Sequence, residues 1–191
     1  MCRKVCVLLV LAVCLFTGIN CYRSKKAEEQ CVNYYSNGET FDLTELSGSF
    51  YAVYFWPPKQ RQRDSCEVID FRVLSPEEIY STKNECRHLE ISNETAVRAT
   101  YTNSTGKIVN LVYFGNKEVK TLYRSCDRDI HAYIFSKVND NYVLGIDCSS
   151  GGFGVLMSRT YPSLPEVYNT VNSIEIMTGR DGSQDCELRR L

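Results

Sequence analysis

The residues best able to do chemistry in this 191-residue chain are its ten cysteines, its two histidines and the neighbouring acids Glu77 and Glu78. In a strand these two acids would face opposite ways, and we expect them to be solvated. The sequence has no GxSxG nucleophile elbow, no HExxH zinc motif and no glycine-rich loop followed by GK[ST]. Nothing in the sequence brings His88 or His131 to a nucleophile or an acid partner, and the latter is flanked by Ile130 and Ala132 like an ordinary strand residue. The sequence therefore favours a protein that is not an enzyme.

The first 21 residues predict export. Arg3 and Lys4 precede an apolar run from Val5 to Phe16, a pattern typical of a secretory signal peptide over residues 1–21. A run of about 12 apolar residues is too short to cross a bilayer as a helix, although an uncleaved signal anchor is the alternative. We expect a single secreted, extracellular domain over residues 22–191.

The cysteine count fits an oxidising compartment. Cleavage after Cys21 leaves an even number of cysteines, which predicts three disulfides among fifteen possible connectivities. The remaining cysteines are Cys31, Cys66, Cys86, Cys126, Cys148 and Cys186. They lack the CxxC pairs of zinc sites, and oxidised thiols bind no metal, so no metal site is expected.

The glycosylation sequons fit a secreted protein, and the net charge gives no support for binding to polyanions. The triplets NET at Asn93 and NST at Asn103 are glycosylation acceptors, which fits secretion. Without Arg3 and Lys4 the chain carries 20 basic and 23 acidic residues, a net charge of −3. This balance gives no electrostatic reason to expect nucleic acid or an anionic membrane as a partner.

Apolar and polar residues alternate with period two through the middle of the chain. Phe71 and Val73, for example, alternate with Asp70 and Arg72, and the turn signals NSTGK, FGNKE, NDN and SSGG separate such runs. This pattern predicts an all-β antiparallel sandwich or barrel. The expected strands are 49–56, 66–74, 77–84, 95–103, 107–114, 118–125, 129–137, 141–148 and 153–160. An eight-stranded barrel needs one fewer, so one segment between 77 and 126 should be irregular or merged.

One late segment has the period of a helix instead. Ser163 and Glu166 have capping-box spacing, and Pro165 is tolerated in a first turn. Leu164, Val167, Val171 and Ile174 form an apolar stripe, which predicts one amphipathic helix packed outside the sheet.

Three segments, "LSGSFYAVY" (46–54), "NDNYVLGIDC" (139–148) and "LMSRTYPSLP" (156–165), resemble the three motifs of the lipocalin family in the family's order. The resemblance covers the chain from Cys31 to Cys186 and is most similar to secreted arthropod lipocalins. It implies an eight-stranded up-and-down antiparallel barrel closed at one end by Gly48, Phe50 and Arg159. Phe50 stands where tryptophan is usual, so part of the sealing role could pass to Trp56.

The same resemblance implies a disulfide pattern and argues against haem. It pairs Cys31 with Cys148 and Cys66 with Cys186, which leaves Cys86 with Cys126. Haem-binding lipocalins of blood feeders carry a histidine ligand in a segment similar to "EEIYSTK", but this chain has Ser81 at that position. We therefore expect no cofactor.

A lipocalin barrel is about wide enough for one small ligand. The residues assigned inward by alternation are Phe71, Val97, Ala99, Tyr101, Val109, Leu111, Tyr113, Tyr133 and Phe135. This lining is apolar with tyrosine hydroxyls that could orient a polar group. The leading hypothesis is a carrier of a small hydrophobic molecule such as a bilin, retinoid, fatty acid, sterol or odorant. The alternative for the interior is a plain core filled by these aromatics.

A second hypothesis places the function in loops of the same fold. The basic loop "PPKQRQRD" (57–64), with Lys59, Arg61 and Arg63, is the candidate surface for a protein partner, as in antihaemostatic or protease-directed effectors. A solvated loop without a partner is the alternative.

Overall fold

The computed structural model describes residues 29, 31–34, 40–59, 63–86, 94–124 and 130–188. The signal peptide, His88, Asn93, Arg61 and Cys126 lie outside these residues.

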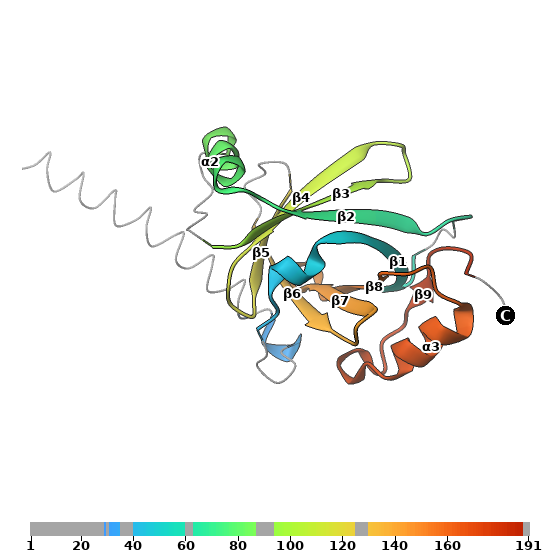
Figure 1. Cartoon of the computed structure of the whole chain (residues 1–191). Coiled ribbons are helices and arrows are strands. Elements are labelled where there is room, and N and C mark those ends of the chain that lie inside the picture. Colours follow the sequence, from blue (N-terminus) through green and yellow to red (C-terminus); the bar gives the residue numbers. More distant parts are fainter. Residues whose placement is uncertain are drawn as a thin grey trace, which may run out of the picture.

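The strands close into an antiparallel barrel (Figure 1). Its strands are β1 (Gly48–Trp56), β2 (Glu67–Val73), β3 (Ala96–Thr102), β4 (Ile108–Phe114), β5 (Lys120–Arg124), β6 (Ile130–Lys137), β7 (Tyr142–Asp147) and β8 (Phe153–Ser158). Each strand pairs with the next along the chain, and β1 pairs with both β2 and β8. The predicted all-β class and the closed eight-stranded barrel are confirmed.

The barrel is closed through β1. One edge of this strand pairs with β2 along its first half and with a short strand near the end of the chain along its second half. Gly48 to Ala52 pair with β2, whereas Tyr54 and Phe55 pair with the short strand β9 (Ser183–Gln184) near the end of the chain. The opposite edge of β1 pairs with β8. The sequence did not predict β9, since two residues are too few for an alternating pattern.

The segment 77–84 is a helix, so the strand predicted there is wrong. Helix α2 (Pro76–Glu85) begins at a capping box in which Ser75 Oγ accepts from the backbone N–H of Glu78 at 3.3 Å. Glu78 Oε2 in turn accepts from the backbone N–H of Ser75 at 3.0 Å. Proline in the first turn and this reciprocal capping favour helix initiation. Removing the segment from the strands gives the eight that the barrel needs.

Helix α2 is also tied to the barrel by an ion pair. The two Arg72 amino groups donate to the two carboxylate oxygens of Glu78 at 2.8 and 2.7 Å. Glu78 therefore caps the helix and pairs with β2, where the sequence had suggested a solvated strand residue.

Helix α3 (Leu164–Asn172) lies outside the barrel, next to β8 and β9 (Figure 1). Its capping box between Ser163 and Glu166 is present. Val167 is fully buried against a cluster that includes Trp56, Leu144 and Leu156. In the described part of the chain, no helix has the length and apolarity needed to cross a membrane.

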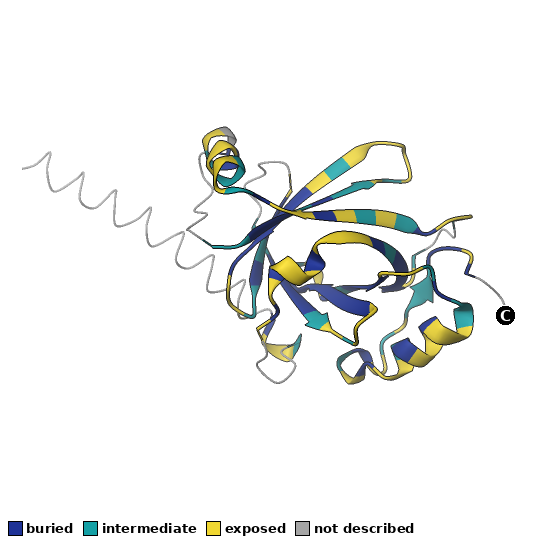
Figure 2. Ribbon diagram, viewed as in Figure 1, coloured by how far each residue is buried: buried dark blue, intermediate teal, exposed yellow. Residues whose placement is uncertain are grey.

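The core has an inner and an outer layer (Figure 2). Inner residues such as Phe50, Phe71 and Tyr113 fill the barrel, and outer residues such as Leu144 and Leu156 pack under α3. Every residue of β7 is buried, because this strand is covered on both faces.

Short 3₁₀ turns complete the described fold. They are η1 (Val32–Tyr34), η2 (Leu43–Leu46), η3 (Cys148–Ser150) and η4 (Glu175–Met177). Ile174, expected in the helical stripe, lies beyond the end of α3, where it precedes η4 and is buried.

Two disulfides fasten the chain ends to the barrel. Cys31 bonds to Cys148, and Cys66 bonds to Cys186, closing sequence separations of 117 and 120 residues. Loops of this length correspond to a stabilisation on the order of 4 kcal/mol each in the chain-entropy description. Cys86 is also disulfide-bonded, and its expected partner lies outside the described residues. The sequon residue Asn103 lies in the β3–β4 turn, and its glycosylation stays a prediction.

The Glu78 contacts predict a dependence of stability on pH. The Arg72 hydrogen bonds, followed by the Ser75 N–H, lower the Glu78 pKa from 4.5 to about 2. A lowered folded-state pKa gives stabilisation that is present above pH 4.5 and is lost as the pH falls toward 2. We expect Glu78→Gln to lower the urea midpoint at pH 6 and to shrink this difference at pH 2.5. An equal difference at the two pH values would contradict the assignment.

Candidate functional site

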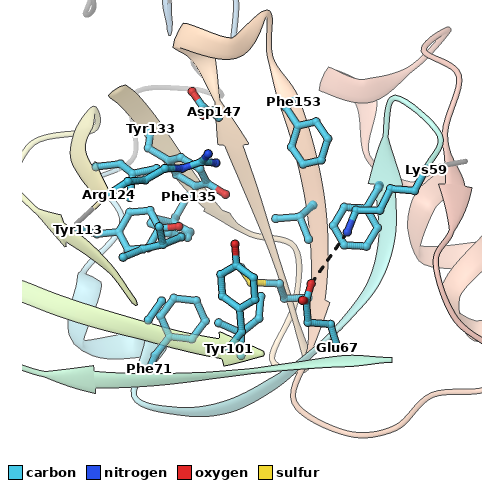
Figure 3. Close-up of a pocket in the computed structure, with 17 residues that line it drawn as sticks. Lys59, Glu67, Phe71, Tyr101, Tyr113, Arg124, Tyr133, Phe135, Asp147 and Phe153 are labelled. Atoms are coloured by element: carbon cyan, nitrogen blue, oxygen red, sulfur yellow. Dashed lines mark ion pairs between the residues drawn. The ribbon is translucent and has the colours of Figure 1, made fainter. Parts of the chain in front are cut away.

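A cavity of about 270 Å³ opens at the end of the barrel where β2 begins and where β3, β5 and β7 end (Figure 3). Its walls come from all eight barrel strands and from the segment after β1. The lining residues are Phe55, Lys59, Glu67, Ile69, Phe71, Ala99, Tyr101, Leu111, Tyr113, Leu122, Arg124, Tyr133, Phe135, Asp147, Phe153, Val155 and Met157. The volume is just below the roughly 300–1,000 Å³ of typical small-molecule sites.

The inward residues predicted by alternation all belong to the inner layer. Those that line the cavity are Phe71, Ala99, Tyr101, Leu111, Tyr113, Tyr133 and Phe135. Val97 and Val109 belong to the same inner cluster but do not line the cavity. Whether these residues contact a ligand stays a prediction, although the lining leaves space that a filled core would not.

Aromatic rings form one wall of the cavity. The ring centroids of Tyr113 and Tyr133 are 5.0 Å apart in an edge-to-face arrangement, and Phe135 lies 5.1 and 4.8 Å from them. Burial is the largest influence and raises the pKa of both tyrosines, so their hydroxyls are neutral at physiological pH.

A glycine on the facing strand makes room for this wall. Gly145 in β7 pairs with Phe135, and a Cβ atom built on it would lie 2.6 Å from Tyr133 Oη and 2.9 Å from its Cε1 atom. No side chain fits between the β7 backbone and this ring. The glycine within "NDNYVLGIDC" therefore sets the position of Tyr133.

Four charged side chains form a closed cluster at one side of the cavity mouth. Lys59 Nζ is 3.4 Å from Asp185 Oδ2 and 3.9 Å from Glu67 Oε2. Arg63 contacts the same two acids, with Nη1 at 3.2 Å from Glu67 Oε1 and Nε at 3.6 Å from Asp185 Oδ2. Burial lowers the pKa of Lys59, an effect that the nearby Asp185 opposes.

This cluster bears on the two interpretations of the basic loop. Lys59 Nζ lies 3.4 Å from the centroid of the Phe55 ring, and both Lys59 and Arg63 are partly buried and paired with acids. The two basic side chains are therefore part of the barrel mouth. Whether this loop binds a protein partner stays a prediction.

Two further charged residues, Asp147 and Arg124, lie on the side of the cavity away from Lys59 (Figure 3). Asp147 accepts hydrogen bonds from the backbone N–H and the hydroxyl of Ser150 at 3.1 and 2.9 Å, and its Oδ2 is 3.1 Å from His131 Nδ1. Arg124 lies beside Tyr133 with its guanidinium at the cavity wall (Figure 3). Among the described residues, no group of three or more His, Cys, Asp or Glu side chains is arranged to hold a metal.

The opposite end of the barrel is sealed by an arginine and an aromatic ring. The Arg159 guanidinium carbon is 4.5 Å from the centroid of the fully buried Phe50 ring. Its Nη1 donates to the Ser47 carbonyl at 3.3 Å, and Nη2 donates to the Glu45 carbonyl. Gly48 has φ of 108°, a conformation that strongly favours glycine, and lies against this arginine. The structure thus brings together the three residues that the resemblance assigned to the closed end.

Trp56 does not share this sealing role, contrary to the possibility raised by the sequence. It lies at the other end of β1 in the outer cluster, where its ring centroid is 4.7 Å from that of Tyr54. A bulge between Ala52 and Tyr54 shifts the alternation of β1, so that Phe55 faces inward and Trp56 outward. The physical reason is the extra residue, which reverses the face of everything after it.

Sequence reasoning missed more than half of the cavity wall. Leu122 and Arg124 alternate in β5, and Val155 and Met157 alternate in β8, so the same period-two pattern could have found them. Glu67 was missed because a carboxylate at an inward position looks like an exposed residue. Only the partners that come from distant segments explain its burial.

No family model matches the chain, and no curated protein matches it. Among solved structures, it is similar to lobster apocrustacyanin A1 at 9% identity, covering 76% of this chain and 79% of that chain with a TM-score of 0.47. It is also similar to apocrustacyanin C2 at 13% identity, covering 86% and 85% with a TM-score of 0.46. A third is apocrustacyanin C1 at 12% identity, covering 87% and 86% with a TM-score of 0.46. Crustacyanins are lipocalins, and the strand pairing described above establishes the barrel of this chain.

The closed end generates a stability prediction. Arg159→Met keeps much of the side-chain length but removes the hydrogen bonds to η2 and the cation–π contact, so we expect a loss of about 1–2 kcal/mol in the free energy of unfolding. Arg159→Lys keeps the charge without the planar guanidinium, so its free energy of unfolding should lie between those of the wild type and Arg159→Met. Urea denaturation measures these differences, and unchanged stability in Arg159→Met would show that the seal contributes nothing.

The contact at Gly145 generates a second prediction. Gly145→Ala should destabilise the fold by about 1–3 kcal/mol, because the added methyl overlaps the Tyr133 ring and hydroxyl. In Gly145→Ala/Tyr133→Phe the closest atom is removed, so the cost of the alanine should be smaller in this background. A double-mutant cycle by urea denaturation measures the coupling, and strictly additive effects would refute the proposed contact.

Proposed function

We propose that this protein is a binding protein of the lipocalin type that holds one small hydrophobic molecule in the barrel cavity. The observation that carries this proposal is the cavity of about 270 Å³ with an aliphatic and aromatic lining, open at one end of a barrel sealed at the other. No reaction is involved. The protein acts by removing the ligand from water.

The size of the cavity selects among the ligand classes that the sequence left open. Its volume is below the range that holds a typical drug-sized molecule. Single-chain or single-ring ligands, such as a medium-chain fatty acid or an odorant, fit this volume better than a bilin or a sterol does.

The expected affinity is modest. Burying about 300 Å² of apolar ligand surface at roughly 25 cal/mol per Å² gives about 7 kcal/mol before association and ordering costs. This corresponds to dissociation constants around the micromolar range or weaker, unless polar contacts add to it.

The setting that we propose for this activity is extracellular. Disulfides persist in oxidising compartments, and both chain ends of the domain are anchored by them. Secretion also fits the apolar segment predicted as a signal peptide and the sequon at Asn103.

Binding can be tested with a fluorescent fatty acid and a cavity-filling variant. We expect one displaceable site per chain, and organic extraction of native protein should release a lipophile detectable by mass spectrometry. Ala99→Phe adds a ring at a fully buried position of the cavity wall and should weaken binding at least tenfold. Val68→Phe, on the exposed outer face of β2, is the matched control and should bind normally.

Two outcomes would contradict the proposal. One is the absence of binding by folded wild-type protein across a broad panel of small lipophiles. The other is equal binding by the Ala99→Phe variant, which would place the site outside the barrel.

A further inference from the structure

We infer that the ligand carries a carboxylate at its polar end and that Arg124 is the residue that binds it. This inference rests on the proposed function and names the chemistry of the same cavity. It follows from which polar groups around the cavity already have partners and which do not.

The acids around the cavity already have hydrogen-bonding or ion-pair partners within the protein. Both oxygens of Asp147 accept hydrogen bonds from Ser150, and the His131 ring lies against them. The Glu67 carboxylate is shared between Arg63 and Lys59, which also contact Asp185. Within this cluster two cations balance two anions, so it offers no net charge to a ligand.

Arg124 is the exception. It lines the cavity, yet among the described residues no acid pairs with it and no carbonyl accepts from its guanidinium. Its charge acts on Tyr101, Tyr113 and Tyr133, where it opposes the rise of the pKa caused by burial. The unpaired charge in the mouth of the barrel is therefore positive.

The neighbouring hydroxyls add donors on the same side. Tyr101, Tyr113 and Tyr133 line the cavity, and burial keeps their hydroxyls protonated, so each has an O–H that can donate to a ligand. Figure 3 shows the Arg124 guanidinium and the Tyr101 hydroxyl both pointing into the cavity. A guanidinium fork flanked by hydroxyl donors matches the planar, acceptor-only carboxylate.

The geometry also orients the ligand. The floor includes Phe71 and Met157, which pair with the closed-end half of β1, and it suits a hydrocarbon tail. The carboxylate would stay near solvent at Arg124, which avoids the cost of burying an anion. A medium-chain monocarboxylate has both parts at a size that this cavity can hold.

Three ligands with the same tail test the inference: octanoate, 1-octanol and octylamine, measured by isothermal titration with the full mature chain at pH 7. We expect octanoate to bind about tenfold or more tightly than 1-octanol, and its affinity to fall as salt is raised. Arg124→Gln should reduce octanoate affinity about tenfold and change 1-octanol binding less than twofold. Arg98→Gln, on the outer face of β3, is the matched control and should bind all three ligands as the wild type does.

The remaining outcomes separate this inference from the proposed function. Equal binding of octanoate and 1-octanol, with no effect of Arg124→Gln, would overturn the carboxylate assignment and leave the carrier function standing. Tightest binding of octylamine, lost in Glu67→Gln, would overturn it in favour of a cationic ligand. Failure of all three ligands would also overturn it, and only failure of the fluorescent fatty acid as well would remove the carrier function.

Discussion

The double pairing of β1 is the constraint on which the cavity depends. A sheet that curls without closing would leave β2 and β8 as open edges, and its inner face would have to be covered by other elements. Because the first half of β1 pairs with β2 while its other edge pairs with β8, the inner face encloses itself. The enclosed face then has two different ends. Arg159 and η2 close one end against Phe50, and the other end remains lined by charged side chains.

Polar chemistry in this barrel is graded from the floor to the mouth. The floor is aliphatic and aromatic, the middle carries tyrosine hydroxyls that burial keeps protonated, and the charged residues of the lining lie at the mouth, where the acids have charged or hydrogen-bonding partners. This gradient follows from the cost of burying charge without partners. The residues that would recognise a polar group therefore lie at the ends of strands. Substitutions at these positions can change the ligand without disrupting the barrel.

Period-two alternation was sufficient to predict the all-β antiparallel class and the inward faces of β3 and β4, and the resemblance to lipocalins chose the barrel over the sandwich. It failed where local chemistry outweighed the pattern. The segment after Ser75 contains apolar and polar residues that fit a strand, but its capping box and early proline determine a helix. In β1 the bulge between Ala52 and Tyr54 reverses the faces of Phe55 and Trp56, and no single residue type marks it. The burial of Glu67 with Lys59, Arg63 and Asp185 depends on three separate segments meeting, which residue patterns within one segment do not encode.

The short strand β9 has a consequence for the behaviour of the protein under reducing conditions. It covers the half of the β1 edge that β2 leaves free, and the bond between Cys186 and Cys66 holds the residues just after it. Reduction of that bond would allow the carboxyl-terminal segment to dissociate from β1. The backbone N–H and C=O groups of Tyr54 and Phe55 would then be exposed and could pair with a strand of another chain. The Cys66–Cys186 bond would therefore hinder pairing between chains as well as stabilise the fold.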